Sequence, residues 1–207
     1  MSHPFFSGLN ETLICEHKTN SWNTDDTTPY HCHNGYEILV FIGGHASFFV
    51  ENDGKILEPG DIVCCPPGAF HRAMPLQDKA YDRFLIAIPH EQLEKLNTVN
   101  TNLASCFFRG RASLPLLHPA QGTFQKILSC CRELEQCLAE HIYGWDVLCT
   151  ALLSQILVML NQEKAVLSAP SFSNPIPPLV SEIYDYIDKN FTDTLICSRQ
   201  CLESEQL

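Results

Sequence analysis

Short runs rich in β-branched and aromatic residues, separated by turn residues, fill the segment from about Leu13 to Ile88. We expect strands over Glu37–Ile42, Ala46–Glu51, Lys55–Leu57, Asp61–Cys65 and Phe84–Ile88. The intervening Gly43-Gly44, Asn52-Asp53-Gly54 and Glu58-Pro59-Gly60 supply the positive φ or the fixed proline φ that tight turns require. This spacing predicts antiparallel hairpins that form a sandwich or a barrel.

The hydrophobic period changes from two to 3.6 after Ile88. Pro89 opens a short predicted helix that ends at Leu96, and a weak strand is expected at Cys106–Phe108. An amphipathic helix follows over Thr123–Glu140. The next helix, about Tyr143–Glu163, is apolar nearly all round, so we expect it to be buried on more than one side. In one arrangement this helix packs with one side on the barrel and with another on the preceding helix. In the arrangement that we favour, a second subunit covers part of it as well.

A segment rich in Pro and Ser, residues 165–178, indicates a linker. The chain then divides into an N-terminal arm and barrel (1–122), a helical pair (123–164), this linker and a C-terminal part (179–207). Apolar positions at helical spacing continue from Leu179 to about Asn190, whereas the sequence after Leu195 shows no clear period. The fold class that we predict is therefore mainly β with C-terminal α.

Charge and cysteine content narrow the possible partners and the compartment. The formal net charge is -11, from 13 Lys and Arg against 24 Asp and Glu, so the average surface repels nucleic acid and anionic lipid. The 11 cysteines form no C-x-x-C pair, and several lie within apolar runs, which is typical of reduced, buried thiols in a cytoplasmic protein. The N-terminus lacks a signal-peptide pattern, and the apolar stretch Val147–Leu160 is too short to span a bilayer, so we expect no membrane association.

Histidines and a glutamate with a distinctive spacing form the strongest candidate for chemistry. His31 and His33 alternate on an expected strand and share a face, Glu37 follows the Asn34-Gly35 turn, and His71 comes after a second tight turn. By the same alternation, Cys32 should point away from the two imidazoles. Three imidazoles and one carboxylate can then converge on one point.

These two segments resemble the paired motifs of the cupin superfamily. The pattern H-x-H-x3-E-x6-G is met by His31, His33, Glu37 and Gly44, and the pattern G-x5-P-x-G-x2-H is met by Gly60, Pro66, Gly68 and His71. The sequence departs from the motifs in having no glycine six residues before His31 and in having Pro75 where Asn is usual. The resemblance implies a barrel of the double-stranded β-helix type. It also implies a divalent metal, Zn, Ni, Fe or Mn, held by His31, His33, Glu37 and His71.

Beyond the barrel, the chain resembles the ligand-binding and dimerisation region of AraC-type transcriptional regulators, across roughly Phe5–Lys164. Residues 176–195 are similar to the first helix of that family's DNA-binding domain and to the turn after it, and the likeness stops at Leu195. The resemblance implies a sensor rather than an enzyme. A small carbohydrate-like or organic-acid effector would bind in the barrel, and a homodimer would form through residues 123–163. Specific DNA binding would require a complete C-terminal domain.

The candidate effector-binding residues beside the metal ligands are aromatic or cationic: Tyr36, Arg83, Trp22 and Tyr30. Each has an ordinary alternative, because aromatic residues in such runs are more often core and Arg83 can pair with Asp82 or Glu51 at the surface. Two other functions stay open. One is a metal-dependent cupin enzyme of the dioxygenase or isomerase class, and the other is an interaction protein that forms mixed dimers with a full-length regulator.

Overall fold

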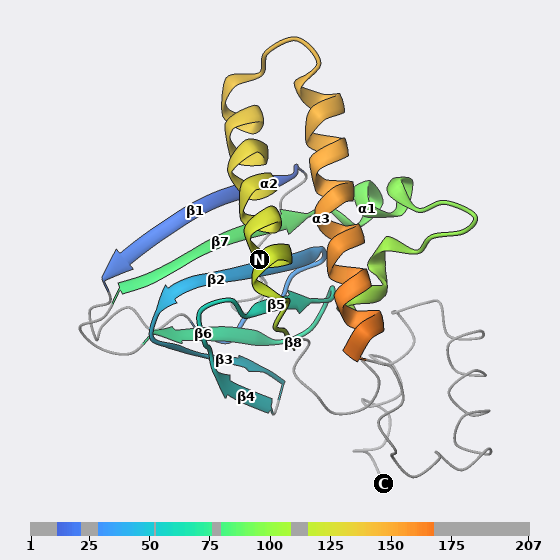
Figure 1. The fold of residues 1–207 in the computed structure, drawn as a ribbon. Helices are drawn as coiled ribbons and strands as arrows, with labels where there is room; N and C mark the ends of the chain where they lie inside the picture. The colour runs from blue at the N-terminus through green and yellow to red at the C-terminus, as the bar shows by residue number, and fades with distance from the viewer. Residues whose placement is uncertain (1–11, 22–28, 52, 76–79, 109–115, 168–207) are drawn as a thin grey trace, which may run out of the picture. The chain divides into compact units, whose positions relative to one another are not determined.

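The structure is a computed structural model that describes residues 12–21, 29–51, 53–75, 80–108 and 116–167. Strands precede two long helices, which confirms the predicted class (Figure 1). The strands are β1 (Ile14–Ser21), β2 (Tyr36–Gly44), β3 (Ala46–Val50), β4 (Asp53–Ile56), β5 (Ile62–Cys65), β6 (His71–Pro75), β7 (Ala80–Ile88) and β8 (Leu116–Leu117). The helices are α1 (His90–Leu96), the 3-10 helix η1 (Leu103–Phe107), α2 (Gln121–Glu140) and α3 (Trp145–Leu167). The chain divides after Ser168 into two units, and the second lies outside the described residues.

Two antiparallel sheets build the β part. The larger has the strand order β1-β7-β2-β5-β8, and the smaller has the order β4-β3-β6. Strand β2 is central in the larger sheet, where Glu37 is paired with Cys65 on β5 and with Ala87 on β7. The first residue of β6 is His71, which pairs with Val50 in the smaller sheet. Each sheet therefore contributes one candidate ligand near a strand end.

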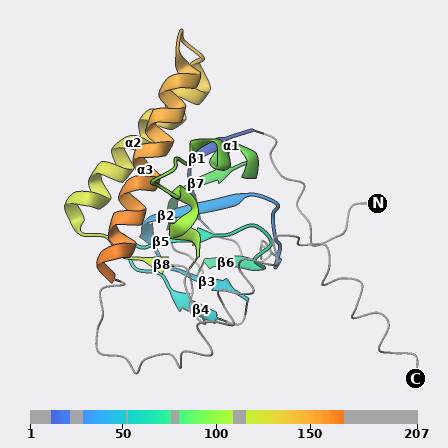
Figure 2. The same cartoon turned by 90° about the vertical axis from the view of Figure 1, so that its right-hand side faces the viewer.

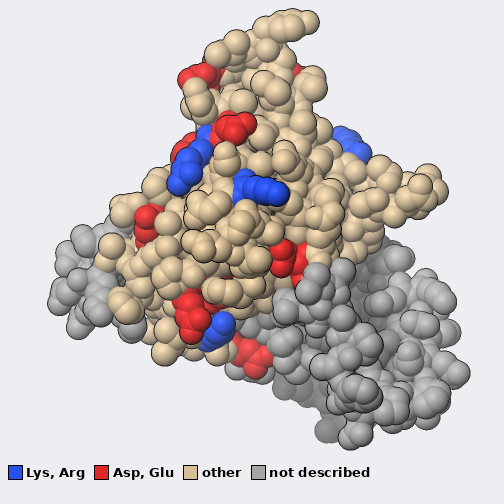
Figure 3. All heavy atoms as spheres, viewed as in Figure 1, with Lys and Arg blue, Asp and Glu red and all other residues tan. Residues whose placement is uncertain are grey.

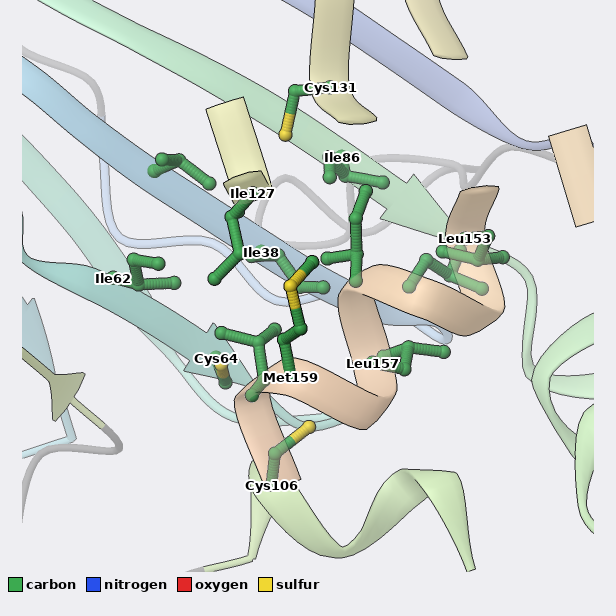
Figure 4. Close-up of a cluster of buried hydrophobic side chains, with 14 of the residues drawn as sticks. Ile38, Ile62, Cys64, Ile86, Cys106, Ile127, Cys131, Leu153, Leu157 and Met159 are labelled. Atoms are coloured by element: carbon green, nitrogen blue, oxygen red, sulfur yellow. The ribbon is translucent and has the colours of Figure 1, made fainter. Parts of the chain in front are cut away.

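Alternation along β2 separates two hydrophobic cores. Leu39 and Phe41 face inward and pack with Phe48 and Val50 of the smaller sheet, so this core fills the space between the sheets. Ile38 and Val40 face outward and pack with side chains from the helices. Figure 4 shows this outer core, with Ile38, Ile62 and Ile86 of the sheet beside Ile127, Leu153, Leu157 and Met159 of the helices. Each fully buried aliphatic side chain of this kind contributes roughly 2 kcal/mol of transfer free energy.

Helices α2 and α3 form an antiparallel hairpin that lies along the outer face of the larger sheet, and its connecting loop projects past the sheet (Figures 1 and 2). On α3, Leu153, Ile156, Leu157 and Leu160 are fully buried. The opposite face of α3 is exposed and includes Val147, Leu148 and Val158. Among the described residues, α3 is thus buried on one side only.

Helix α3 is also longer than the sequence pattern indicated. Residues Trp145–Lys164 are long and apolar enough to cross a membrane, judged by length and composition alone, with a hydropathy of 1.2. This helix is longer than the apolar stretch Val147–Leu160 that the sequence marked, and a core helix of a globular domain meets the same criteria of length and composition. Its buried face, which packs on α2 and on the sheet core, gives α3 the role of a core helix in this fold.

Several local expectations need correction. Cys106–Phe108 is not a strand, because η1 occupies this segment and the Asn102 side chain accepts a hydrogen bond from Ala104 N at 2.9 Å at its start. The expected N-terminal arm contains strand β1, which pairs with β7 over its whole length. Strand β8 was not predicted. Helix α3 continues to Leu167, into the expected linker.

The turn after β2 illustrates why a glycine was needed there. Gly44 has φ +103°, and a Cβ on this residue would lie 1.6 Å from the carbonyl oxygen of Ala80 on β7. Any side chain would collide with backbone at that point, so the close approach of β2 and β7 requires Gly44.

Candidate metal centre

Backbone contacts between two loops and the two sheets position the candidate ligands. His31 and His71 form an isolated antiparallel bridge, with His31 N donating to His71 O at 3.1 Å and His71 N to His31 O at 2.9 Å. Gly68 N donates to the carbonyl oxygen of His33 at 2.7 Å, which ties the two motif loops together. From alternation we expected His31 and His33 on a regular strand. They lie instead in this bridged segment before β2. Glu37 is the second residue of β2.

The structure brings all four predicted ligands together. One candidate ligand atom from each of His31, His33, Glu37 and His71 lies within 4.8 Å of the others. The imidazole ring centroids are 4.5 to 5.1 Å apart. Glu37 and His71 are buried, whereas His31 and His33 are half-buried, so the cluster is reached from the side of the two motif loops.

Backbone carbonyls fix the orientation of two of the rings. His31 Nδ1 lies 2.9 Å from the carbonyl oxygen of Pro29, and His71 Nδ1 lies 2.9 Å from that of Ala69. A carbonyl oxygen can only accept, so each Nδ1 must carry the proton and donate it. In a neutral ring the lone pair is then on Nε2, which is the arrangement that metal-binding histidines usually show.

The Glu37 carboxylate is in contact with imidazoles on both of its oxygens. Its Oε2 is 2.8 Å from His33 Nε2, and its Oε1 is 3.4 Å from His71 Nε2. Burial alone would raise the pKa of Glu37, but the hydrogen bonds and the positive charge of His33 and His71 lower it to about 2. Glu37 is therefore ionised throughout the neutral range and presents two acceptor oxygens to the cluster.

The histidines respond to the same neighbours. Burial lowers the pKa of His31, and the adjacent His71 and His33 lower it further, against the opposing effect of the Pro29 carbonyl. Burial also disfavours charge on His71, but its contact with Glu37 and its bond to Ala69 raise the pKa above the ordinary value. His31 is therefore the ring most readily available as a neutral ligand.

The residues fit a divalent transition metal. His71 Nε2 is buried and makes no hydrogen bond of good geometry, with Glu37 Oε1 as its neighbour at 3.4 Å, so a metal could take the place of this contact. Ligand atoms that share one metal at about 2.1 Å are at most about 4.2 Å apart, so the four side chains would need to draw together by roughly half an ångström. Three imidazole nitrogens with one carboxylate suit zinc, nickel, iron or manganese.

The predicted effector-binding residues are not brought to this cluster. Tyr36 precedes Glu37 on β2 and so points to the opposite face, where its ring packs on Phe107 at 4.6 Å and on His90 at 5.6 Å. The expectation that Tyr36 faces the barrel interior is therefore corrected, and strict alternation from Glu37 was the signal that could have shown it.

Arg83 and Tyr30 make other contacts. Arg83 pairs with Phe41 on β2, four positions from Glu37, and its guanidinium lies 4.1 Å from the ring centroid of Tyr81. The ring of Tyr30 is covered by the guanidinium of Arg72 at 4.6 Å. Trp22 lies outside the described residues.

Two polar features escaped the sequence reasoning. The Tyr81 hydroxyl is buried among the inner-core side chains without a hydrogen-bond partner, and both burial and the negative charge of Glu37 raise its pKa. Asp61, fully buried, accepts a hydrogen bond from His118 Nδ1 at 2.8 Å. Tyr81 stood within an apolar strand, and Asp61 and His118 are 57 residues apart, so no local pattern marked them.

Comparison with known proteins identifies the family of this chain. Residues 20–157 match the family described as the AraC-like ligand binding domain. Among solved structures, ToxT from Vibrio cholerae, crystallised with an unsaturated fatty acid, is 13% identical with a TM-score of 0.50, covering 94% of this chain and 69% of that one. The AraC-like activator CuxR is 11% identical with a TM-score of 0.43, covering 79% and 53%.

A cupin from Methanocaldococcus jannaschii is 22% identical with a TM-score of 0.34, covering 43% of this chain and 79% of that one. A search among curated proteins found no match. The match to the family spans about two thirds of the chain, so this chain belongs to the AraC-like ligand-binding domains, the ligand-sensing domains of transcription regulators.

Proposed function

We propose that this chain senses a small effector, a carbohydrate-like molecule or an organic acid, through a divalent metal held by His31, His33, Glu37 and His71. The observation that carries the proposal is the orientation of the rings. Backbone carbonyls hold Nδ1 of His31 and His71, which leaves both Nε2 atoms for a metal, and Nε2 of His71 lies 3.4 Å from Glu37 Oε1. A bound first-row metal would offer open coordination positions to oxygen atoms of such an effector.

The chain's own residues support coupling from the site to the helices. Glu37 contacts the cluster from one face of β2, while the neighbouring Ile38 is fully buried in the core shared with α2 and α3. An effector that favours one arrangement of Glu37 would shift the population of hairpin positions by the difference in its affinity for the two states. A cytoplasmic regulator of this kind needs no catalysis.

The hairpin is also the proposed homodimer surface, over residues 123–163. Val147, Leu148 and Val158 are apolar and exposed on the face of α3 that this chain leaves uncovered. In Figure 3 most of the described surface on this face is uncharged, with a few acidic and basic side chains scattered from top to bottom. A second copy would bury these side chains, and sedimentation of wild type against Leu148→Glu tests this. A monomeric wild type at high concentration would refute the dimer.

The test of the sensor combines metal analysis with thermal unfolding. Purified protein is analysed for Zn, Ni, Fe and Mn, and Zn²⁺ titration is followed by thermal-shift measurements with sugars and small organic acids. We expect about one bound metal per chain and a further stabilisation by at least one effector class in the metal-loaded protein. His31→Ala should abolish both effects.

His118→Ala is the matched control, since His118 is a part-exposed histidine that contacts a buried carboxylate outside the cluster. It should leave metal binding intact. Equal loss in the two variants, or effector stabilisation that persists in His31→Ala, would contradict the metal-assisted sensor. Effector stabilisation of fully metal-free protein would retain the sensor and reject the metal.

A metal-dependent cupin enzyme is the second candidate, because the same convergence of three imidazoles and a carboxylate favours it. It requires turnover by the metal-loaded protein that disappears in His33→Ala. A stably folded, metal-loaded protein that leaves every tested substrate unchanged while it still binds an effector would exclude this function.

A further inference from the structure

Two cysteines occupy facing positions at the projecting end of the α2–α3 hairpin. Cys137 lies three residues before the end of α2 at Glu140, and Cys149 lies four residues after the start of α3 at Trp145. With a rise of about 1.5 Å per residue, the two lie at nearly the same height in an antiparallel pair. The loop is pinned at this level, because His141 N donates to the Cys137 carbonyl oxygen at 3.3 Å.

Both cysteines belong to the apolar seam between the helices. Leu134, three residues before Cys137, and Leu153, four residues after Cys149, are fully buried, and positions with these spacings share a helix face. Helix axes about 8–10 Å apart, with Cα atoms about 2.3 Å from each axis, place facing Cα atoms about 3.4–5.4 Å apart. A disulfide needs Cα atoms about 4.4–6.8 Å apart.

The local electrostatics agree that the thiols are neighbours. Burial raises the pKa of Cys149 to about 11, and the second-largest contribution to this increase comes from Cys137. Both cysteines are free thiols in this structure.

A surface hollow gives this pair access to solvent. A cavity of about 560 Å³ opens between the start of β1, α1 and the hairpin, and Cys149 lines it together with Leu13, Leu138 and Trp145. Cys137 is itself half-buried. By contrast, Cys15 is engaged deeper in the core, where its Sγ donates to the Cys131 carbonyl oxygen at 3.4 Å.

We propose that Cys137 and Cys149 form a reversible disulfide that clamps the projecting end of the hairpin when the protein meets a peroxide. The Cys137 thiolate attacks one peroxide oxygen and breaks the O–O bond, which gives a sulfenic acid on Cys137 and one water. Cys149 sulfur then attacks the sulfenic sulfur, the S–S bond forms, the S–O bond breaks, and a second water leaves with the Cys149 proton. The two thiols lose two electrons, and hydrogen peroxide is reduced to two waters.

The sequence allows a direct test. Trypsin cuts after Arg132 and Lys164 and at no residue between them, so one peptide, residues 133–164, holds Cys137 and Cys149 and no other cysteine. The full-length chain is treated with hydrogen peroxide, and its free thiols are alkylated. The protein is then digested with trypsin without reductant, and peptide masses are measured by mass spectrometry. We expect this peptide to be two hydrogens lighter and unalkylated, and to regain two alkylation sites after reduction.

Variants separate the clamp from general oxidation. Cys149→Ser should leave a sulfenic acid on Cys137 that dimedone labels, and Cys130→Ser, a buried cysteine on the neighbouring tryptic peptide, should oxidise as wild type does. The disulfide should form about tenfold faster in folded than in urea-unfolded protein. It should also raise the unfolding midpoint of wild type by roughly 5 °C, but not that of Cys137→Ser.

The wild-type protein alone can overturn the proposal. A 133–164 peptide that keeps two alkylated thiols while other cysteines oxidise would reject it. So would equal rates in folded and unfolded protein, or a disulfide that joins 133–164 peptides of two copies.

Discussion

Two buried carboxylates in this domain have opposite surroundings. Asp61 Oδ2 accepts the backbone N–H of Glu58 at 2.9 Å and lies 3.4 Å from Lys55 Nζ, and its Oδ1 is bonded to His118. Its own N–H donates to the Glu58 carbonyl oxygen at 2.9 Å, which closes the turn before β5. Among the described residues, Glu37 has hydrogen-bond or ion-pair contacts only with imidazoles.

The difference separates a structural carboxylate from a functional one. A backbone N–H is a permanent donor, so Asp61 is satisfied in every state of the folded protein. Imidazole nitrogens can donate, accept or bind a metal, so the surroundings of Glu37 change with protonation and ligation. Burial alone would have ranked the two carboxylates equally.

The largest expected contrast is in metal affinity. Glu37→Gln removes the only charged candidate ligand and should weaken Zn²⁺ binding about 100-fold or more, whereas Asp61→Asn should change it by less than about threefold. Isothermal titration calorimetry of both variants against wild type measures this. Similar losses in the two variants would mean that the Asp61 turn supports the site.

Stability should show the reverse order. Asp61→Ala leaves the Glu58 N–H and the His118 donor without their buried acceptor, which should lower the free energy of unfolding by about 2–3 kcal/mol. In metal-free protein at neutral pH, Glu37→Gln should lower it by less than Asp61→Ala does, because an amide can donate to the imidazole lone pairs. Urea denaturation at pH 7.5 gives both values, and a larger loss for Glu37→Gln would contradict the distinction.

The smallest contrast is a pH dependence. The pKa of Glu37 is lowered from 4.5 to about 2 in the folded protein, so its stabilising contribution is complete above the unfolded value and is lost as the pH falls through the interval between them. Between pH 5 and pH 3, metal-free wild type should lose about 2 kcal/mol more stability than Glu37→Gln. Urea titrations at both pH values, taken as the difference between the proteins, remove the contribution of other carboxylates. Parallel curves would show that Glu37 is not held as an anion.

The sequence predicted much of the barrel because its turns and its ligands are local patterns. Glycine and proline marked the turns, and the four metal-ligand candidates followed from motif spacing. Strand β1 was missed because its sequence, ICEHKTNS, is mostly polar and is a strand through pairing with β7. The Asp61–His118 contact depends on bringing β8 beside β5, which no local pattern encodes.

Tyr36 teaches a related limit. Its position beside Glu37 in the motif suggested a shared pocket, yet one step along a strand reverses the face. The exposed side of α3 shows a different case, because its apolar composition suggested burial, yet Val147, Leu148 and Val158 are exposed among the described residues.

Strand β2 separates the core inside the barrel from the core beneath the helices. The β2 residues Ile38 and Val40 pack against side chains of the helices, whereas Glu37 and Leu39 point into the barrel interior. Because protein interiors are close-packed, a displacement of β2 on one face is transmitted to the side chains on the other face. A ligand that draws Glu37 toward it would therefore also shift the packing of Leu157 and Ile127 against the other face of β2.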